Sequence, residues 1–302
     1  MTTPNELGAD ELMCAEEAAL KNSAARLSIL AAAFLILIKS GTGWMTGSIS
    51  VWASLLDSAM DIIASTINFF AVRAAARPPD EDHAYGHGKV ESLAGLFQAL
   101  IITVSGFFLV WEALRRLVEP RGTRAEGVGI ATMLVAVTVS AGLVYRLKSV
   151  ARKTDSPALA ADAVHYASDI YSNGAALAAL VVAYLTNWQL ADPLFSLAIS
   201  IYILASAFSV ARDSIDVLMD KRLPAEVDEL ILDIVGRYRS EGTVGVHDVR
   251  TRRSGSIKFI DLHLEVERHK SLEEAHALTV KVIRTIQAEL PRSRVQAHTD
   301  PV

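Results

Sequence analysis

Long apolar runs alternate with short polar stretches over the first two thirds of the chain. The six runs lie at 24–44, 48–72, 92–114, 127–147, 158–185 and 191–210. A helix needs roughly 20 apolar residues to cross the hydrocarbon core of a bilayer, and each run is close to that length. The pattern therefore predicts a polytopic α-helical membrane protein with six transmembrane helices and with both ends of the chain on one side of the membrane.

After Asp220 the pattern changes to that of a small soluble α+β domain. The predicted order is a helix at 224–241, strands at 244–251 and 256–267, a helix at 271–290 and a strand at 294–298. Alternation in the second strand places Ile260, Leu262 and Leu264 on one face, with Val266. His263 then lies on the opposite face, where it is available for binding.

These two patterns divide the chain into four parts. We expect a cytosolic N-terminal leader at 1–23, a six-helix transmembrane domain at 24–210, a linker at 211–223 and a cytoplasmic α+β domain at 224–302. Ser271 and Glu274 have the spacing of a capping box, which supports the second helix of the tail. So short a domain buries little core by itself, so we expect it to contribute to a dimer interface.

Composition narrows the class of protein. The chain has 302 residues, of which 51% are hydrophobic and only 21% charged, and its formal net charge is −5. Domains that bind nucleic acid usually carry a basic face, so no nucleic-acid partner is expected. Cys14 is the single cysteine, which excludes an internal disulfide and a thiolate metal cluster. The acidic first residues do not resemble a secretory signal.

Positive charges in the short connections predict the orientation in the membrane. The connections on the side of the termini contain Arg73, Arg77, Lys89, Arg146, Lys148, Arg152 and Lys153. Short cytoplasmic loops carry an excess of Lys and Arg, so both termini are predicted to be cytoplasmic. One connection on the opposite side, 115–126, also holds arginines. Glutamates alternate with them, which is typical of a solvated turn.

Two pairs of polar residues interrupt the second and fifth apolar runs. Asp57 and Asp61 are four residues apart, and His165 and Asp169 repeat this spacing. Residues four apart share one face of a helix. A charge at membrane depth costs roughly 2.5–3.5 kcal/mol even on the lenient insertion scale, so two acids on one face require a partner.

A divalent cation between these two helices would provide that partner. One imidazole and three carboxylates match the four N/O ligands of a tetrahedral zinc site. When the ion leaves, protons on the same groups would offset their charge, which predicts exchange of metal for protons. The alternative is a proton relay, or helix-terminal polar residues, without metal.

A second candidate site lies in the loop between the second and third runs. Asp80, His83 and His87 lie in a loop that also contains Gly86 and Gly88, which allow the backbone to turn tightly. These three side chains are able to converge on one metal ion. The alternative is a polar loop with two surface histidines.

The tail holds a third candidate set. Its members are His247, His263, His276, His298 and Asp300. Five of the eight histidines of the chain fall in this short domain, which favours a histidine-rich metal site over isolated surface residues. His269 lies between Arg268 and Lys270, and we expect no role for it.

In combination, the two intramembrane pairs, the loop sequence from Asp82 to Ser92 and the tail histidines resemble the cation diffusion facilitator family, especially its bacterial ferrous-iron and zinc efflux members. The resemblance extends over nearly the whole chain. It implies a homodimer in the bacterial inner membrane that exports Zn²⁺, or Fe²⁺, Cd²⁺ or Co²⁺, in exchange for protons by alternating access. It also implies a ferredoxin-like, metallochaperone-like tail.

The resemblance also assigns roles to residues. It implies a transport site at Asp57, Asp61, His165 and Asp169, a loop site at Asp80, His83 and His87, a binuclear tail site at His247, His263, His276, His298 and Asp300, and a charge interlock between Lys89 and Asp220. Metal is then substrate and regulatory ligand, protons and membrane lipid are further partners, and no organic cofactor is expected. Two alternatives to a transporter are a membrane metal sensor and a membrane metalloenzyme with the same ligands.

Overall fold

The computed structural model describes residues 4–46, 49–118, 127–186, 188 and 190–302. The chain forms two compact units, the first extending to Ile215 and the second from Asp216 to Val302. Each unit is described by itself.

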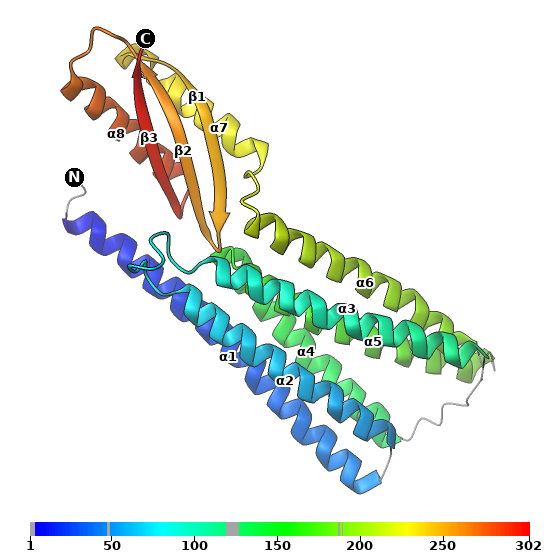
Figure 1. Ribbon diagram of the computed structural model, residues 1–302. Coiled ribbons are helices and arrows are strands. Elements are labelled where there is room, and N and C mark those ends of the chain that lie inside the picture. The colour runs from blue at the N-terminus through cyan, green and yellow to red at the C-terminus, as the bar shows by residue number, and fades with distance from the viewer. Residues whose placement is uncertain (1–3, 47–48, 119–126, 187, 189) are drawn as a thin grey trace. The chain divides into compact units, whose positions relative to one another are not determined.

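Six long helices make up the first unit, in agreement with the six predicted spans (Figure 1). They are α1 (Pro4–Thr46), α2 (Ile49–Ala75), α3 (Lys89–Val118), α4 (Gly127–Thr154), α5 (Pro157–Thr186) and α6 (Ala191–Leu218). Most extend past the apolar runs at one or both ends, because polar residues that flank a span can continue the helix outside hydrocarbon. The residues from Pro4 onward belong to the same helix as the first span.

Small side chains allow the helices of this unit to pack closely. The main core joins α1, α2, α4 and α5 with the start of α3 and contains many alanines, among them Ala24, Ala71 and Ala163. Helix α3 packs on α6, where a Cβ at Gly106 would lie 2.8 Å from Leu204 Cδ2. In lipid, close backbone approach through Ala and Gly is a main source of helix association.

Within the described residues, four stretches are long and apolar enough to cross a membrane. They are Glu16–Thr42, Lys89–Val118, Ile130–Thr154 and Ala191–Leu218. The remaining two long helices, α2 and α5, are those that contain the Asp and His pairs. Large apolar side chains such as Leu37, Phe107 and Phe108 are more than half exposed on the outside of the unit, as expected for a surface in contact with lipid.

The second unit is a three-stranded sheet with two helices, in the predicted order of elements. Its elements are α7 (Ala225–Arg237), the 3₁₀ turn η1 (Arg239–Glu241), β1 (Thr243–Ser254), β2 (Ile257–Val266), α8 (Leu272–Glu289) and β3 (Ser293–Pro301). The strand order is β1-β2-β3, with β1 antiparallel and β3 parallel to β2. This is the ferredoxin-like β-α-β-β-α-β arrangement without its first strand, as predicted.

Both helices cover one face of this sheet (Figure 1). Ile260 and Leu264 are fully buried and Leu262 nearly so, which confirms the predicted apolar face. The capping box at the start of α8 is also present, since Ser271 Oγ accepts from the backbone N–H of Glu274 and Glu274 accepts from that of Ser271.

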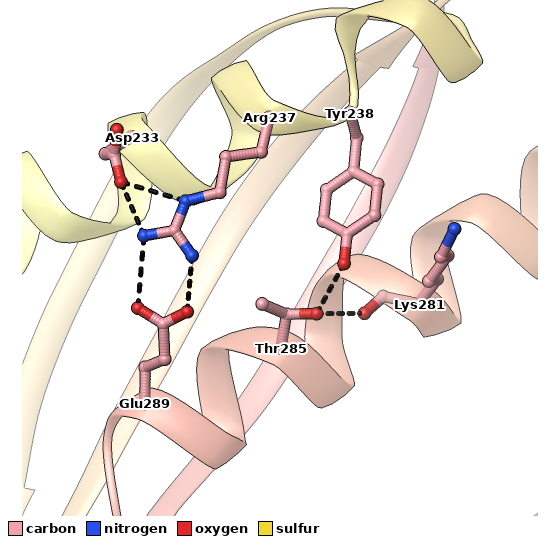
Figure 2. A network of polar contacts seen from close by, with 6 residues as sticks. All are labelled: Asp233, Arg237, Tyr238, Lys281, Thr285 and Glu289. Atoms are coloured by element: carbon pink, nitrogen blue, oxygen red, sulfur yellow. Dashed lines mark hydrogen bonds and ion pairs between the residues drawn. The ribbon is translucent and has the colours of Figure 1, made fainter.

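Polar contacts join the two helices along their outer edge (Figure 2). The Arg237 guanidinium on α7 donates to Asp233 on its own helix at 2.6 Å and to Glu289 on α8 at 2.5 Å. The hydroxyls of Tyr238 and Thr285 lie 2.6 Å apart. The ion pairs of Arg237 are exposed, so their effect on stability is small compared with that of the buried sheet face. They align the two helices over the sheet.

Candidate metal centres

Three of the four predicted intramembrane ligands converge between α2 and α5. His165 Nε2 lies 3.0 Å from Asp61 Oδ1, and both side chains are buried. One ligand atom each from Asp61, His165 and Asp169 lies within 4.8 Å of the others. The side chain of Asp57 lies outside the described residues. Its backbone is one turn before Asp61 on α2.

This arrangement suits a divalent cation. Two helices supply nitrogen and carboxylate-oxygen atoms close enough together to share one ion, and these are the atoms that bind first-row divalent metals. The carboxylates repel one another when ionised, and a cation of charge +2 offsets most of that repulsion.

A hydrogen-bonded network surrounds this cluster. The hydroxyl of Tyr166, a fully buried residue, lies 2.8 Å from Ser65 Oγ on α2 and donates to the Ser28 carbonyl on α1 at 3.2 Å. Tyr166 follows His165 directly, and their rings meet edge to face. The network therefore connects α1 and α2 to the part of α5 that carries the candidate ligands His165 and Asp169.

Two buried acids of the membrane unit were not predicted as functional residues. Asp162 on α5 has no exposed surface and accepts a hydrogen bond from Ser28 Oγ at 2.7 Å. Glu91 at the start of α3 pairs with Lys21 Nζ of α1 at 2.8 Å and also accepts from Ser156. Asp162 stands three residues before His165, hence on the same helix face, and this spacing was a detectable signal.

The loop residues Asp80, His83 and His87 lie together, with one ligand atom each within 4.8 Å. His83 Nδ1 is 3.4 Å and His87 Nε2 is 3.3 Å from the carboxylate of Asp80. The backbone N–H of His83 donates to Asp80 Oδ1 at 2.7 Å, and this hydrogen bond lowers the pKa of Asp80. Gly86 takes a positive φ of 84°, as the tight turn requires.

In the tail, the strand register places three histidines side by side. His247 on β1 is opposite His263 on β2, and His263 is opposite His298 on β3. Asp300 follows two residues after His298 and so shares its face. His263 Nδ1 lies 2.9 Å from Asp300 Oδ2, and His298 Nε2 lies 3.2 Å from Asp300 Oδ1. The hydrogen bond from His263 lowers the pKa of Asp300.

This row extends to a residue that was not predicted. His247 Nδ1 lies 3.1 Å from Glu265 Oε1, while its Nε2 is 3.6 Å from Asp300. Glu265 stands two residues after His263 on β2, and residues two apart point to the same face of a strand. This spacing would have been enough to predict Glu265 from the sequence. The cluster therefore contains both imidazole nitrogens and carboxylate oxygens, which is a donor set that suits zinc or another divalent metal.

Other predicted residues lie apart from these clusters. His276 is exposed on α8, and none of the three metal-ligand groups found among the described residues includes it. His269 lies near Glu267, at 3.3 Å, and is also outside these groups. Asp220 lies 3.4 Å from Arg252 within the second unit, and Lys89 begins α3 of the first unit. The interlock between Lys89 and Asp220 stays a prediction.

Two family models match the chain and together cover most of it. The cation efflux transmembrane domain matches residues 25–219, and the cation efflux protein cytoplasmic domain matches residues 223–302. The second begins a few residues before α7.

Similar proteins include the cation-efflux pump FieF of Citrobacter koseri and that of Klebsiella pneumoniae. Each is 42% identical over 282 residues, which are 93% of this chain and 93% of the relative. FieF of Yersinia pestis is 42% identical over 279 residues, or 92% of each chain. Among solved structures, the zinc form of CzrB, described as a candidate zinc transporter, is 34% identical with a TM-score of 0.26. The match covers 27% of this chain and 92% of the CzrB chain.

Proposed function

Because this chain belongs to the cation efflux family, we propose that it exports a divalent transition metal from the cytoplasm in exchange for protons. The observation that carries this proposal is the convergence of Asp61, His165 and Asp169 between two helices of the membrane unit. Buried ionisable groups at membrane depth are costly, and a substrate path for ions is the usual reason for them.

The proposed transport cycle follows from the charges at this site. In a state open to the cytoplasm, the ionised carboxylates and neutral His165 bind the metal, with Asp57 as the fourth ligand. Movement of α2 relative to α5 then opens the site to the other side and loosens the ligands. Protons bind to the emptied site and offset the repulsion between its acids on the return step. Each step keeps the net charge of the buried site low.

Zinc is the proposed principal substrate, with Fe²⁺, Cd²⁺ and Co²⁺ as further candidates. One imidazole and three carboxylates form the four-coordinate N/O set that zinc accepts in tetrahedral geometry. The same donors also bind other first-row divalent ions, and geometry decides among them. A closed four-ligand site favours zinc over Mg²⁺ or Ca²⁺, which prefer six or more oxygen ligands.

The rest of the chain fits regulation of such a transporter. We place it as a homodimer in the bacterial inner membrane with both termini in the cytoplasm, an orientation supported by the Lys and Arg of the predicted cytoplasmic connections. In this orientation, metal ions of the cytoplasm can bind to the loop cluster and to the tail histidines. Binding there would favour one conformation of the dimer over the other. We propose the division of the chain into leader, transmembrane domain, linker and cytoplasmic domain that the sequence predicts. Contacts between Lys89 and Asp220 would connect the two protomers of the dimer.

The test is metal-driven proton flux in proteoliposomes. Asp169→Ala removes a ligand from the site, so we expect Zn²⁺-driven flux to fall to background while the dimer still assembles. His269→Ala is the matched control and should transport like the unmodified protein. Full transport by Asp169→Ala would contradict the site. The absence of flux in the unmodified protein would favour a sensor or an enzyme instead.

A further inference from the structure

Asp162 is a buried acid that the proposed metal site does not use. It stands three residues before His165 on the same face of α5, about 4.5 Å along the helix axis. Its Oδ2 accepts the hydrogen bond from Ser28, whereas its Oδ1 is buried without a hydrogen-bond partner among the described residues. Half of this carboxyl group is therefore unsatisfied in the membrane unit.

Glu91 shows what a satisfied buried acid in the same unit looks like. One of its oxygens pairs with Lys21 and the other accepts from Ser156, so both oxygens and the charge have partners. Asp162 has a single hydroxyl donor, from Ser28. An ionised carboxylate with so little compensation is expensive to bury, and such a group takes up a proton unless a cation is near.

The groups that act on Asp162 come from three helices. Helix α5 contributes His165 and Tyr166, α2 contributes Asp61, and α1 presents the hydroxyl of Ser28. Asn68 on α2 also acts on Asp162, although its amide nitrogen is buried without a hydrogen-bond partner within the part of the chain that the structure describes. Lys21 on α1 lies two turns from Ser28 and is bound to Glu91. The ionisable groups of the metal site, His165 and Asp61, are thus among those that act on Asp162.

We propose that Asp162 is an internal proton-binding station for the exchange of metal and protons. This inference rests on the proposed function. Without metal, Oδ1 carries one proton and the carboxyl group is neutral. A divalent cation arriving at Asp61, His165 and Asp169 repels that proton, which leaves to the cytoplasm, and the ionised Asp162 then stabilises the bound cation. When the metal departs outward, Asp162 takes up one proton again.

The test counts protons released when metal binds. Asp162→Asn preserves the size of the side chain and an oxygen for Ser28, but it does not titrate. Purified full-length protein in weak buffer is titrated with Zn²⁺ alone, and a pH-sensitive dye reports the released protons. We expect Asp162→Asn to release about one proton fewer per protomer, and the slope of log apparent Zn²⁺ affinity against pH to fall by about one.

A control and a second variant keep the outcome decisive. Asp155→Asn changes an exposed aspartate at the turn before α5, where φ is 47° and Asn is tolerated, and it should match the unmodified protein. Ser28→Ala removes the hydrogen bond that favours ionised Asp162, so proton release should shift to higher pH with its number unchanged.

Two different failures are distinguishable. The proposed proton-binding role of Asp162 is refuted if Asp162→Asn releases as many protons as the unmodified protein and its apparent Zn²⁺ affinity depends on pH with the same slope. If Asp162→Asn does not assemble, an unchanged pH profile in Ser28→Ala refutes it equally. An unmodified protein that binds Zn²⁺ and releases no protons contradicts proton exchange itself.

Discussion

At the scale of single residues, His263 is the centre of the tail cluster. It lies between His247 and His298 on adjacent strands and contacts Asp300. His263→Ala should weaken Zn²⁺ binding at the tail by more than roughly tenfold, because changes around a metal site commonly cost 10–100-fold in affinity. Calorimetry on the full-length protein would measure this.

The same variant separates regulation from transport. Because the tail ligands are distinct from Asp61, His165 and Asp169, flux in proteoliposomes should be reduced but present in His263→Ala. His269→Ala should change neither affinity nor flux. Unaltered Zn²⁺ binding in His263→Ala would exclude the tail cluster as a metal site.

At the scale of elements, the start of α8 depends on its capping box. The Ser271 backbone N–H donates to Glu274, which lowers the pKa of this carboxyl group below its ordinary value. Ionised Glu274 therefore stabilises the folded helix above the pKa of the unfolded chain, near 4.3, and this contribution is lost as pH falls through the lower pKa of the folded state.

Glu274→Gln should thus accelerate amide hydrogen exchange in the first turn of α8 at pH 7. The difference in exchange rate between this variant and the unmodified protein should shrink as the pH is lowered below about 4. Glu274 is then protonated in the folded and in the unfolded state. Glu273→Gln, at the preceding position and outside the capping box, is the matched control. A difference that persisted undiminished at low pH would show that charge on Glu274 is not the cause.

At the scale of the whole molecule, the orientation in the membrane is open to a direct test. Cys14 is the single cysteine and lies in the predicted cytosolic leader. A membrane-impermeant maleimide should label it only after the inner membrane is permeabilised. Val302→Cys in a Cys14→Ser background should behave in the same way, because six spans place both ends on one side. Labelling of either site in intact spheroplasts would contradict the proposed topology.

Local sequence patterns were sufficient to predict the elements. Apolar runs predicted six long helices, alternation predicted the buried face of β2, and the spacing of Ser271 and Glu274 predicted the start of α8. Each of these features depends on residues a few positions apart, whose relation to one another is set by helical or strand periodicity alone. For the same reason, spacing placed His165 and Asp169 on one helix face.

Which faces meet was decided only by tertiary structure. The approach of Asp61 to His165 depends on how α2 packs against α5, and the alignment of His247, His263 and His298 depends on strand register. The sequence grouped His276 with these histidines, whereas the fold leaves it exposed on α8. The sequence showed Asp162 beside the proposed ligands, but only packing against α1 revealed its burial and its unsatisfied oxygen. Such contacts join residues far apart in the chain, so periodicity carries no information about them.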